Sequence, residues 1–70
     1  MKKFRVMVKA NIERPIIDGF NIAAEDAREA VDNAKRFFFT RLSLQGIDVL
    51  ENDIEAIRVT NDCGEVIQLF

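Results

Sequence analysis

Residues 26–39, DAREAVDNAKRFFF, form the only long stretch of the chain with a helical period. With about 100° per residue, its apolar side chains fall within roughly 60° of Ala34 on a helical wheel, and its charged side chains fall on the other side. The apolar stripe consists of Ala27, Ala30, Val31, Ala34, Phe37 and Phe38. Asp26 followed three residues later by Glu29 matches a capping box, in which each side chain accepts a hydrogen bond from the other residue's N–H. The stretch therefore predicts an amphipathic helix that starts at Asp26 and covers an apolar layer.

Phe39 does not fit this stripe, because it falls roughly 140° from the centre, on the polar side. Two interpretations are open. In one, the helix ends near Phe38 and Phe39 turns inward in the following loop. In the other, Phe39 is an exposed aromatic residue that marks a partner or dimer surface.

Before this helix, alternating apolar side chains predict two strands that pair as a hairpin. The first runs from Lys3 to Ile12, and Pro15 ends it because proline has no N–H to donate to a sheet. The second runs from Ile16 to Ala24. The pair Asp18-Gly19 is either the hairpin turn itself or a bulge in the second strand.

After the helix, residues 40–52 predict a loop over the open end of the core, with Gly46 as a stop and a short strand at 47–50. A third strand is expected at 53–60, with Ile57 and Val59 on one face, and a turn at 61–64 leads to a returning strand at 65–70. The order ββαββ predicts a single α+β domain over residues 1–70. We expect a four-stranded, mainly antiparallel sheet with one helix packed on one face.

The residue inventory argues against catalysis. The chain has no histidine, so it lacks the commonest general base and metal ligand, and its glycines are too scattered for a phosphate-binding loop. Cys63, the one cysteine, follows an acid that disfavours its thiolate. We therefore expect a protein that is not an enzyme and has no cofactor or metal. The single cysteine, with no membrane-length apolar run and no secretory segment, favours the cytoplasm.

Charge is distributed unevenly along the chain. Residues 1–14 carry five basic side chains and one acidic one, whereas residues 47–70 carry six acidic side chains and one basic one. Two interpretations are open: the basic and acidic segments neutralise each other in one sheet, or the acidic half forms a patch for a basic partner.

Two passages resemble a known family. The segment FRV at residues 4–6, leading through a hairpin to IAAEDAREAV at 22–31, is similar to the strand-then-helix opening of the DpnD/PcfM-like family, and GIDVLENDI at 46–54 is similar to the acidic segment that follows. These are small proteins of restriction operons, conjugative plasmids and phages, without an established activity. The resemblance implies an origin in a phage or other mobile element. The size and acidity are also similar to those of phage anti-CRISPR proteins.

The main functional hypothesis is a non-enzymatic module that docks on a larger protein through its sheet face or its acidic C-terminal half. A sharper version is an inhibitor that occupies the basic nucleic-acid groove of a host defence nuclease. The candidate contact residues are Phe39, Asp48, Glu51, Asp53, Glu55 and Phe70. One alternative is nucleic-acid binding by the basic N-terminal strand, against which Phe4 counts because it is expected to face the helix. The other is a homodimer joined through Phe39 or an edge strand.

Overall fold

The computed structural model describes residues 1–70 and confirms an α+β fold with the order ββαββ. Two long strands precede a single α-helix, and a short 3₁₀ helix leads into the last two strands. The elements are β1 (Lys2–Ala10), β2 (Ile16–Ala24), α1 (Ala27–Leu44), η1 (Glu51–Asp53), β3 (Ile54–Asn61) and β4 (Val66–Leu69).

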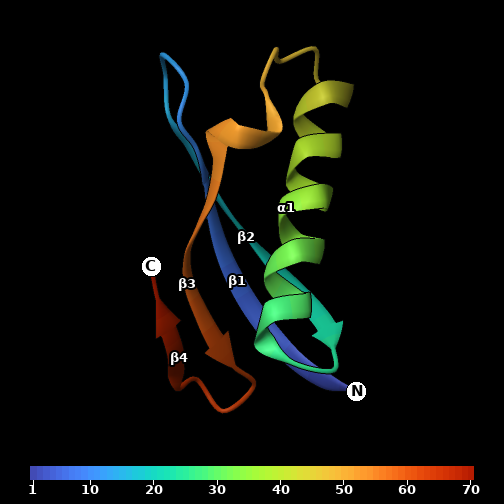
Figure 1. The fold of residues 1–70 in the computed structure, drawn as a ribbon, viewed down its shortest axis with the longest axis vertical. Coiled ribbons are helices and arrows are strands. Elements are labelled where there is room, and N and C mark those ends of the chain that lie inside the picture. The colour runs from blue at the N-terminus through green and yellow to red at the C-terminus, as the bar shows by residue number, and fades with distance from the viewer.

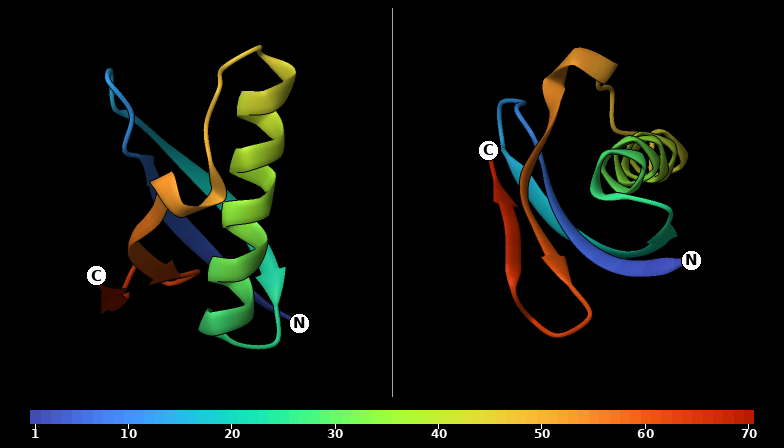
Figure 2. Two further views of the ribbon diagram at one scale, coloured as in Figure 1. Left: turned by 45° about the horizontal axis from the view of Figure 1, so that its top comes forward. Right: turned by 60° about the horizontal axis from the view of Figure 1, so that its bottom comes forward.

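The four strands form one antiparallel sheet in the order β2-β1-β3-β4. Helix α1 lies along one face of this sheet, and no element lies on the other (Figures 1 and 2). Strand β4 forms the edge farthest from the N-terminus in Figure 1, and the C-terminus follows it directly. The fold therefore has two layers and leaves one sheet face open to solvent.

A single core fills the space between the helix and the sheet. Strand β1 contributes alternate residues to it and exposes the residues between them, as the sequence pattern predicts. The core contains no buried polar or charged side chain. It consists of Phe4, Val6, Val8, Ala10, Ile22, Ala24, Ala30, Val31, Ala34, Phe38, Leu42, Val49, Ile54, Ala56 and Val59.

The hairpin turn between β1 and β2 lies at Asn11–Pro15, because Ala10 pairs with Ile16. Asp18 and Gly19 sit within β2, opposite Val8 and Met7, in an unbroken register. The prediction that this pair forms a turn or a bulge is therefore wrong. The missing side chain of Gly19 leaves room for the side chains that lie over it, as described below.

Helix α1 begins as its sequence predicts. Glu29 N–H donates to Asp26 Oδ1 at 2.9 Å, which confirms one bond of the expected capping box. The helix does not end near Phe38, however, but continues to Leu44. It is closed by Gly46 at φ 77°, whose N–H donates to Ser43 while Ile47 N–H donates to Leu42, the bonds of a Schellman cap.

The loop after α1 covers the end of the core, as predicted, and Val49 is buried there. The short strand expected at 47–50 is absent, and η1 follows instead. Asp53 holds this turn, because its Oδ2 accepts a hydrogen bond from Leu50 N–H at 3.1 Å.

The buried stripe of α1 is centred nearer Phe38 than Ala34. On a wheel centred on Phe38, Phe37 and Phe39 lie roughly 100° to either side. The returning loop covers one side only, so Phe39 is half-buried against the core whereas Phe37 is 55% exposed. Placing Phe37 in the core was wrong, and Phe39 is neither in a loop nor fully exposed.

Strand β3 contains a register shift that the sequence pattern does not reveal. Val8 pairs with Ala56 and Met7 with Arg58, so Ile57 is an extra residue between them. The buried residues of β3 are consequently Ile54, Ala56 and Val59. The expectation that Ile57 and Val59 share one face is wrong.

Arg41 connects the second half of α1 to strand β2 through two side-chain contacts. Its Nη1 lies 2.6 Å from Asp18 Oδ2, and its guanidinium carbon lies 5.1 Å from the centre of the Phe20 ring. Phe20 in turn packs against Phe38 with 5.9 Å between ring centres. These contacts position the helix over β2 and leave the opposite sheet face free.

Candidate docking surface

The sheet face away from α1, here called the open face, is built from the alternate residues that the core does not use. Paired residues share a face, so the registers order them in rows across the strands. One row is Asn21, Arg5, Thr60 and Val66, and the next is Gly19, Met7, Arg58 and Leu69. The face is completed by two further rows, which are Ala23 with Lys3, and Ile17 with Lys9 and Glu55.

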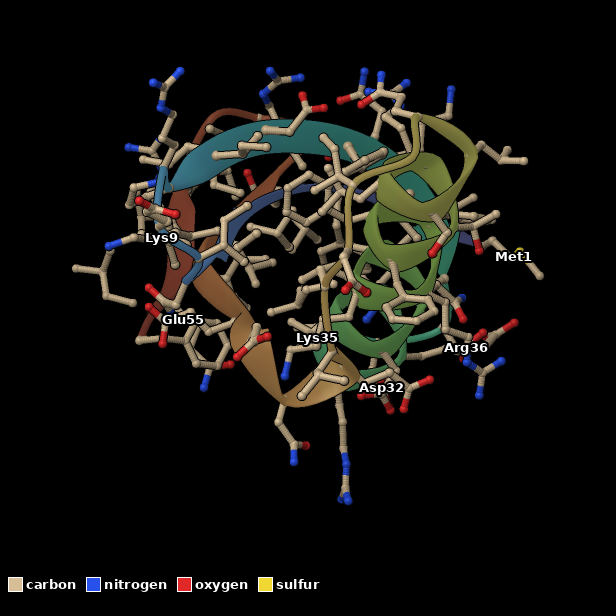
Figure 3. All side chains as sticks on the ribbon, turned by 90° about the horizontal axis from the view of Figure 1, so that it is seen from above. Met1, Lys9, Asp32, Lys35, Arg36 and Glu55 are labelled. Carbon is tan, nitrogen blue, oxygen red and sulfur yellow. The ribbon has the colours of Figure 1, made fainter.

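The strands of the open face are strongly basic. They carry Lys3, Arg5, Lys9 and Arg58 against one acid, Glu55, which lies beside Lys9 on the outer side of the sheet (Figure 3). The only ion pair of the protein joins Arg41 to Asp18 on the helix side, so none of these four cations is paired. The basic β1 does lie beside β3 of the acidic segment, as one interpretation expects, and Glu55 lies opposite Lys9, but no ion pair joins the two segments.

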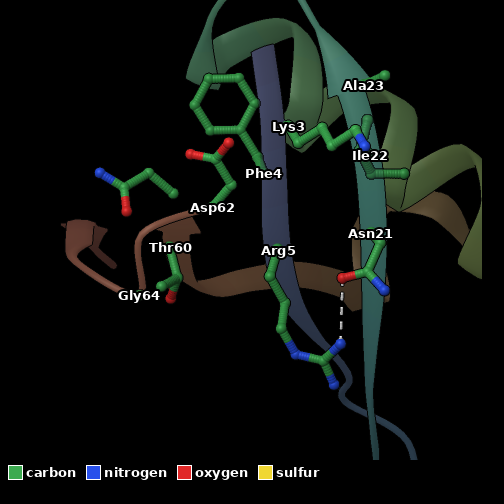
Figure 4. A pocket seen from close by; sticks show the side chains of 10 residues that line it. Lys3, Phe4, Arg5, Asn21, Ile22, Ala23, Thr60, Asp62 and Gly64 are labelled. Atoms are coloured by element: carbon green, nitrogen blue, oxygen red, sulfur yellow. Dashed lines mark hydrogen bonds between the residues drawn. The ribbon is translucent and has the colours of Figure 1, made fainter.

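Arg5 is held in place over β2. Its Nη1 donates to Asn21 Oδ1 at 3.3 Å (Figure 4), and a Cβ atom on Gly19 would come within 2.8 Å of Arg5 Nη2 and of Met7 Sδ. The missing side chain at Gly19 thus makes room for the guanidinium to lie against the sheet. A guanidinium fixed in this way keeps further N–H groups free for a carboxylate or phosphate.

Next to Arg5, the open face is hollowed by a depression of about 560 Å³ between β2 and the β3–β4 turn (Figure 4). Lys3, Arg5, Asn21 and Thr60 line it, and Asp62 from the turn borders it. Two cations and two neutral polar side chains can bind an acidic group there. The chain has no histidine, and its only cysteine, Cys63, is exposed in the turn.

Apolar side chains border the basic centre of the open face. Ile17 is 58% exposed on the β2 side, and Val66, Leu69 and Phe70 are 51%, 71% and 60% exposed on the β4 side. Phe70 and Ile17 line a second, smaller hollow together with Lys9 and Glu55. The face therefore combines unpaired charge with an exposed apolar border.

The six contact residues predicted from the sequence do not form one surface. Phe39 and Glu51 line a common hollow on the helix side, and Asp48 is exposed in the loop that follows α1. Asp53 is half-buried and caps η1. Glu55 and Phe70 lie together on the open face instead.

Sequence reasoning named part of the basic surface but missed the rest. The alternation of β1 already places Lys3, Arg5 and Lys9 on one face. Arg58 joins them only because Ile57 shifts the register of β3, and the isolated Gly19 inside a strand is the one local signal for the close approach of Arg5.

No three histidine, cysteine, aspartate or glutamate side chains are grouped so that they could hold a metal ion. Neither helix combines the length and the apolar character needed to cross a membrane.

Comparison with known proteins adds no family to this picture, so the resemblance to DpnD/PcfM-like proteins stays a prediction. No protein-family model, no curated protein and no solved structure matches the chain.

Proposed function

We propose that the protein is a non-enzymatic protein-binding module that docks through its open face on an acidic surface of a larger protein. The observation that carries the proposal is the group of four unpaired cations, Lys3, Arg5, Lys9 and Arg58, on a sheet face that no other element covers. An acidic partner would gain opposite charge at the centre of the face and apolar contact at its border.

The open face is a better candidate than the acidic half of the chain. The acids at 48–55 are divided between the loop, η1 and β3, and Asp53 is engaged in capping. A partner that bound Glu51 beside Phe39 could not use the same contact to reach Glu55. The inhibitor hypothesis requires an acidic face that enters a basic groove, so the open face gives it no support.

Nucleic-acid binding is the second candidate, because the same four cations could follow a phosphate backbone. Single-stranded recognition also uses aromatic platforms for base stacking. Phe4 is 6% exposed in the core, and the central strands place Met7 and Thr60 on the open face instead of aromatic residues. Phe70, at the β4 border, is the only aromatic side chain on the open face, and a single ring at the border favours a protein partner.

A pair of charge reversals tests the proposal. The probes are a fluorescent peptide of alternating glutamate and leucine and a single-stranded oligonucleotide, each titrated with the protein at low salt. We expect Arg5→Glu with Arg58→Glu to weaken peptide binding about tenfold or more, which corresponds to ~1.4 kcal/mol. Arg28→Glu with Arg36→Glu is the matched control, since both arginines are exposed on α1 away from the open face.

The outcomes separate the candidates. Tight, salt-sensitive binding of the oligonucleotide with a weak peptide signal would replace the proposal by the second candidate. Equal losses in the two double variants would show that net charge, and not the open face, governs binding.

A further inference from the structure

Strand β4 concentrates exposed apolar side chains in a way that the rest of the protein does not. Four of the nine large exposed hydrophobic residues are Val66, Ile67, Leu69 and Phe70, within five consecutive positions. Every residue of β4 is exposed, so the strand contributes nothing to the core and is held by its pairing with β3. As an edge strand, it also presents unpaired backbone groups to solvent.

The two edges of the sheet differ in how they are protected. The β2 edge carries Asp18, which accepts the N–H of Gly19 at 2.8 Å and pairs with Arg41 from the helix. A charge on an edge strand discourages the addition of another strand. Residues 66–70 contain no charged side chain and no proline, so β4 is protected only by its short length and by the extra residue Ile67.

The register of β4 makes the strand complementary to a copy of itself. Val66 pairs with Thr60 and Leu69 with Arg58, and both side chains lie on the open face although they are three positions apart, because Ile67 is an extra residue between them. In an antiparallel pair of two β4 strands, Val66 of one copy can therefore lie opposite Leu69 of the second copy. The two-fold axis then passes between Ile67 and Gln68, and each contact occurs twice.

We infer that two copies of the chain pair edge to edge through β4, joining their four-stranded sheets into one continuous antiparallel sheet. The pairing satisfies backbone groups along β4 and covers Val66 and Leu69 of both copies. No like charges meet. The nearest cations, Arg58 and Arg58 of the second copy, are three strand spacings or roughly 14 Å apart, beyond the Debye length of ~8 Å at physiological salt.

This pairing is independent of the ligand proposed for the open face, but it would place two basic faces side by side. The contact involves one short strand from each copy, so we expect a weak dimer that forms only as the protein concentration rises. The monomer mass is 8.0 kDa.

Sedimentation equilibrium over a wide concentration range measures this association. We expect the average mass of the unmodified chain to rise from the monomer value toward twice that value. The variant with Val66→Lys and Leu69→Lys should stay at the monomer mass at every concentration. Leu44→Lys is the control, because Leu44 is 84% exposed at the end of α1, away from β4, and should still dimerise.

Cross-linking tests the register itself in chains that also carry Cys63→Ser. Cα atoms of opposite residues in an antiparallel pair are about 4.5–5.5 Å apart, within the range that a disulfide spans. Copies with Val66→Cys mixed with copies with Leu69→Cys should therefore form the mixed disulfide at least several times faster than either forms a disulfide with itself.

Three results would overturn the inference. The first is a monomer at all concentrations, and the second is a dimer that survives the two lysine substitutions. The third is a mixed disulfide that forms no faster than the others. Circular dichroism of each variant shows that a loss of association is not a loss of folding.

Discussion

Gly19 shows how one residue in a strand determines the geometry of another. It has no positive φ and forms no turn. Its role is to leave space for the side chains of Arg5 and Met7. We expect Gly19→Ala to displace the guanidinium of Arg5 and to weaken binding of the acidic peptide about three- to tenfold, or ~0.7–1.4 kcal/mol. The free energy of unfolding should change by less than about 1 kcal/mol, because flexible side-chain ends can move and alanine is better than glycine in a strand.

The control for this prediction is Gly19→Ala made in a chain that already carries Arg5→Ala. If Gly19 acts through Arg5, Gly19→Ala has no further effect on peptide affinity once the guanidinium is absent. An equal loss of affinity in both backgrounds would contradict the role assigned to Gly19. Both measurements use the same fluorescence titration.

At the scale of elements, the helix offers a matched pair of adjacent phenylalanines. Phe38 is fully buried, and Phe37 is 55% exposed. We expect Phe38→Ala to lower the free energy of unfolding by about 3–5 kcal/mol, through lost burial and the cavity that remains. Phe37→Ala should cost less than about 1 kcal/mol. Urea denaturation of the two variants measures the difference, and similar losses would show that the face of α1 has been assigned wrongly.

At the scale of the whole molecule, the balance of forces is mainly apolar. The core contains no buried polar or charged group, and the single ion pair, Arg41–Asp18, is partly exposed. We therefore expect the free energy of unfolding to change by less than about 1 kcal/mol between low salt and ~1 M salt, where exposed pairs are screened. Urea unfolding at the two salt concentrations measures this. A loss of several kcal/mol in salt would mean that ion pairs contribute more to stability than this structure provides.

Binding through the open face should weaken in salt, whereas the free energy of unfolding should hardly change. Lys3, Arg5 and Arg58 are exposed and Lys9 is half-buried, so screening by salt reduces their attraction for an acidic partner. Salt therefore distinguishes the two properties of the same molecule. Its core tolerates salt, whereas its proposed contact surface is weakened by it.

The sequence by itself determined the elements and their order. The alternation in β1, the Asp26 cap, the stop at Gly46 and the turn at 61–64 are all local signals. A local signal reports which face of an element is apolar, because the strand and helix periods are set by the backbone alone. That is why the ββαββ order and the α+β class follow from the residues without coordinates.

Only the tertiary structure decided what covers each face. The strand order makes β4 an edge, and the bulge at Ile57 brings Arg58 to the open face. The returning loop covers Phe39 but not Phe37. Each of these outcomes depends on which distant segment packs beside a given residue, and periodicity within one segment carries no information about its neighbours. The elements of this protein can therefore be predicted from its sequence, whereas the surfaces that it exposes depend on how those elements pack.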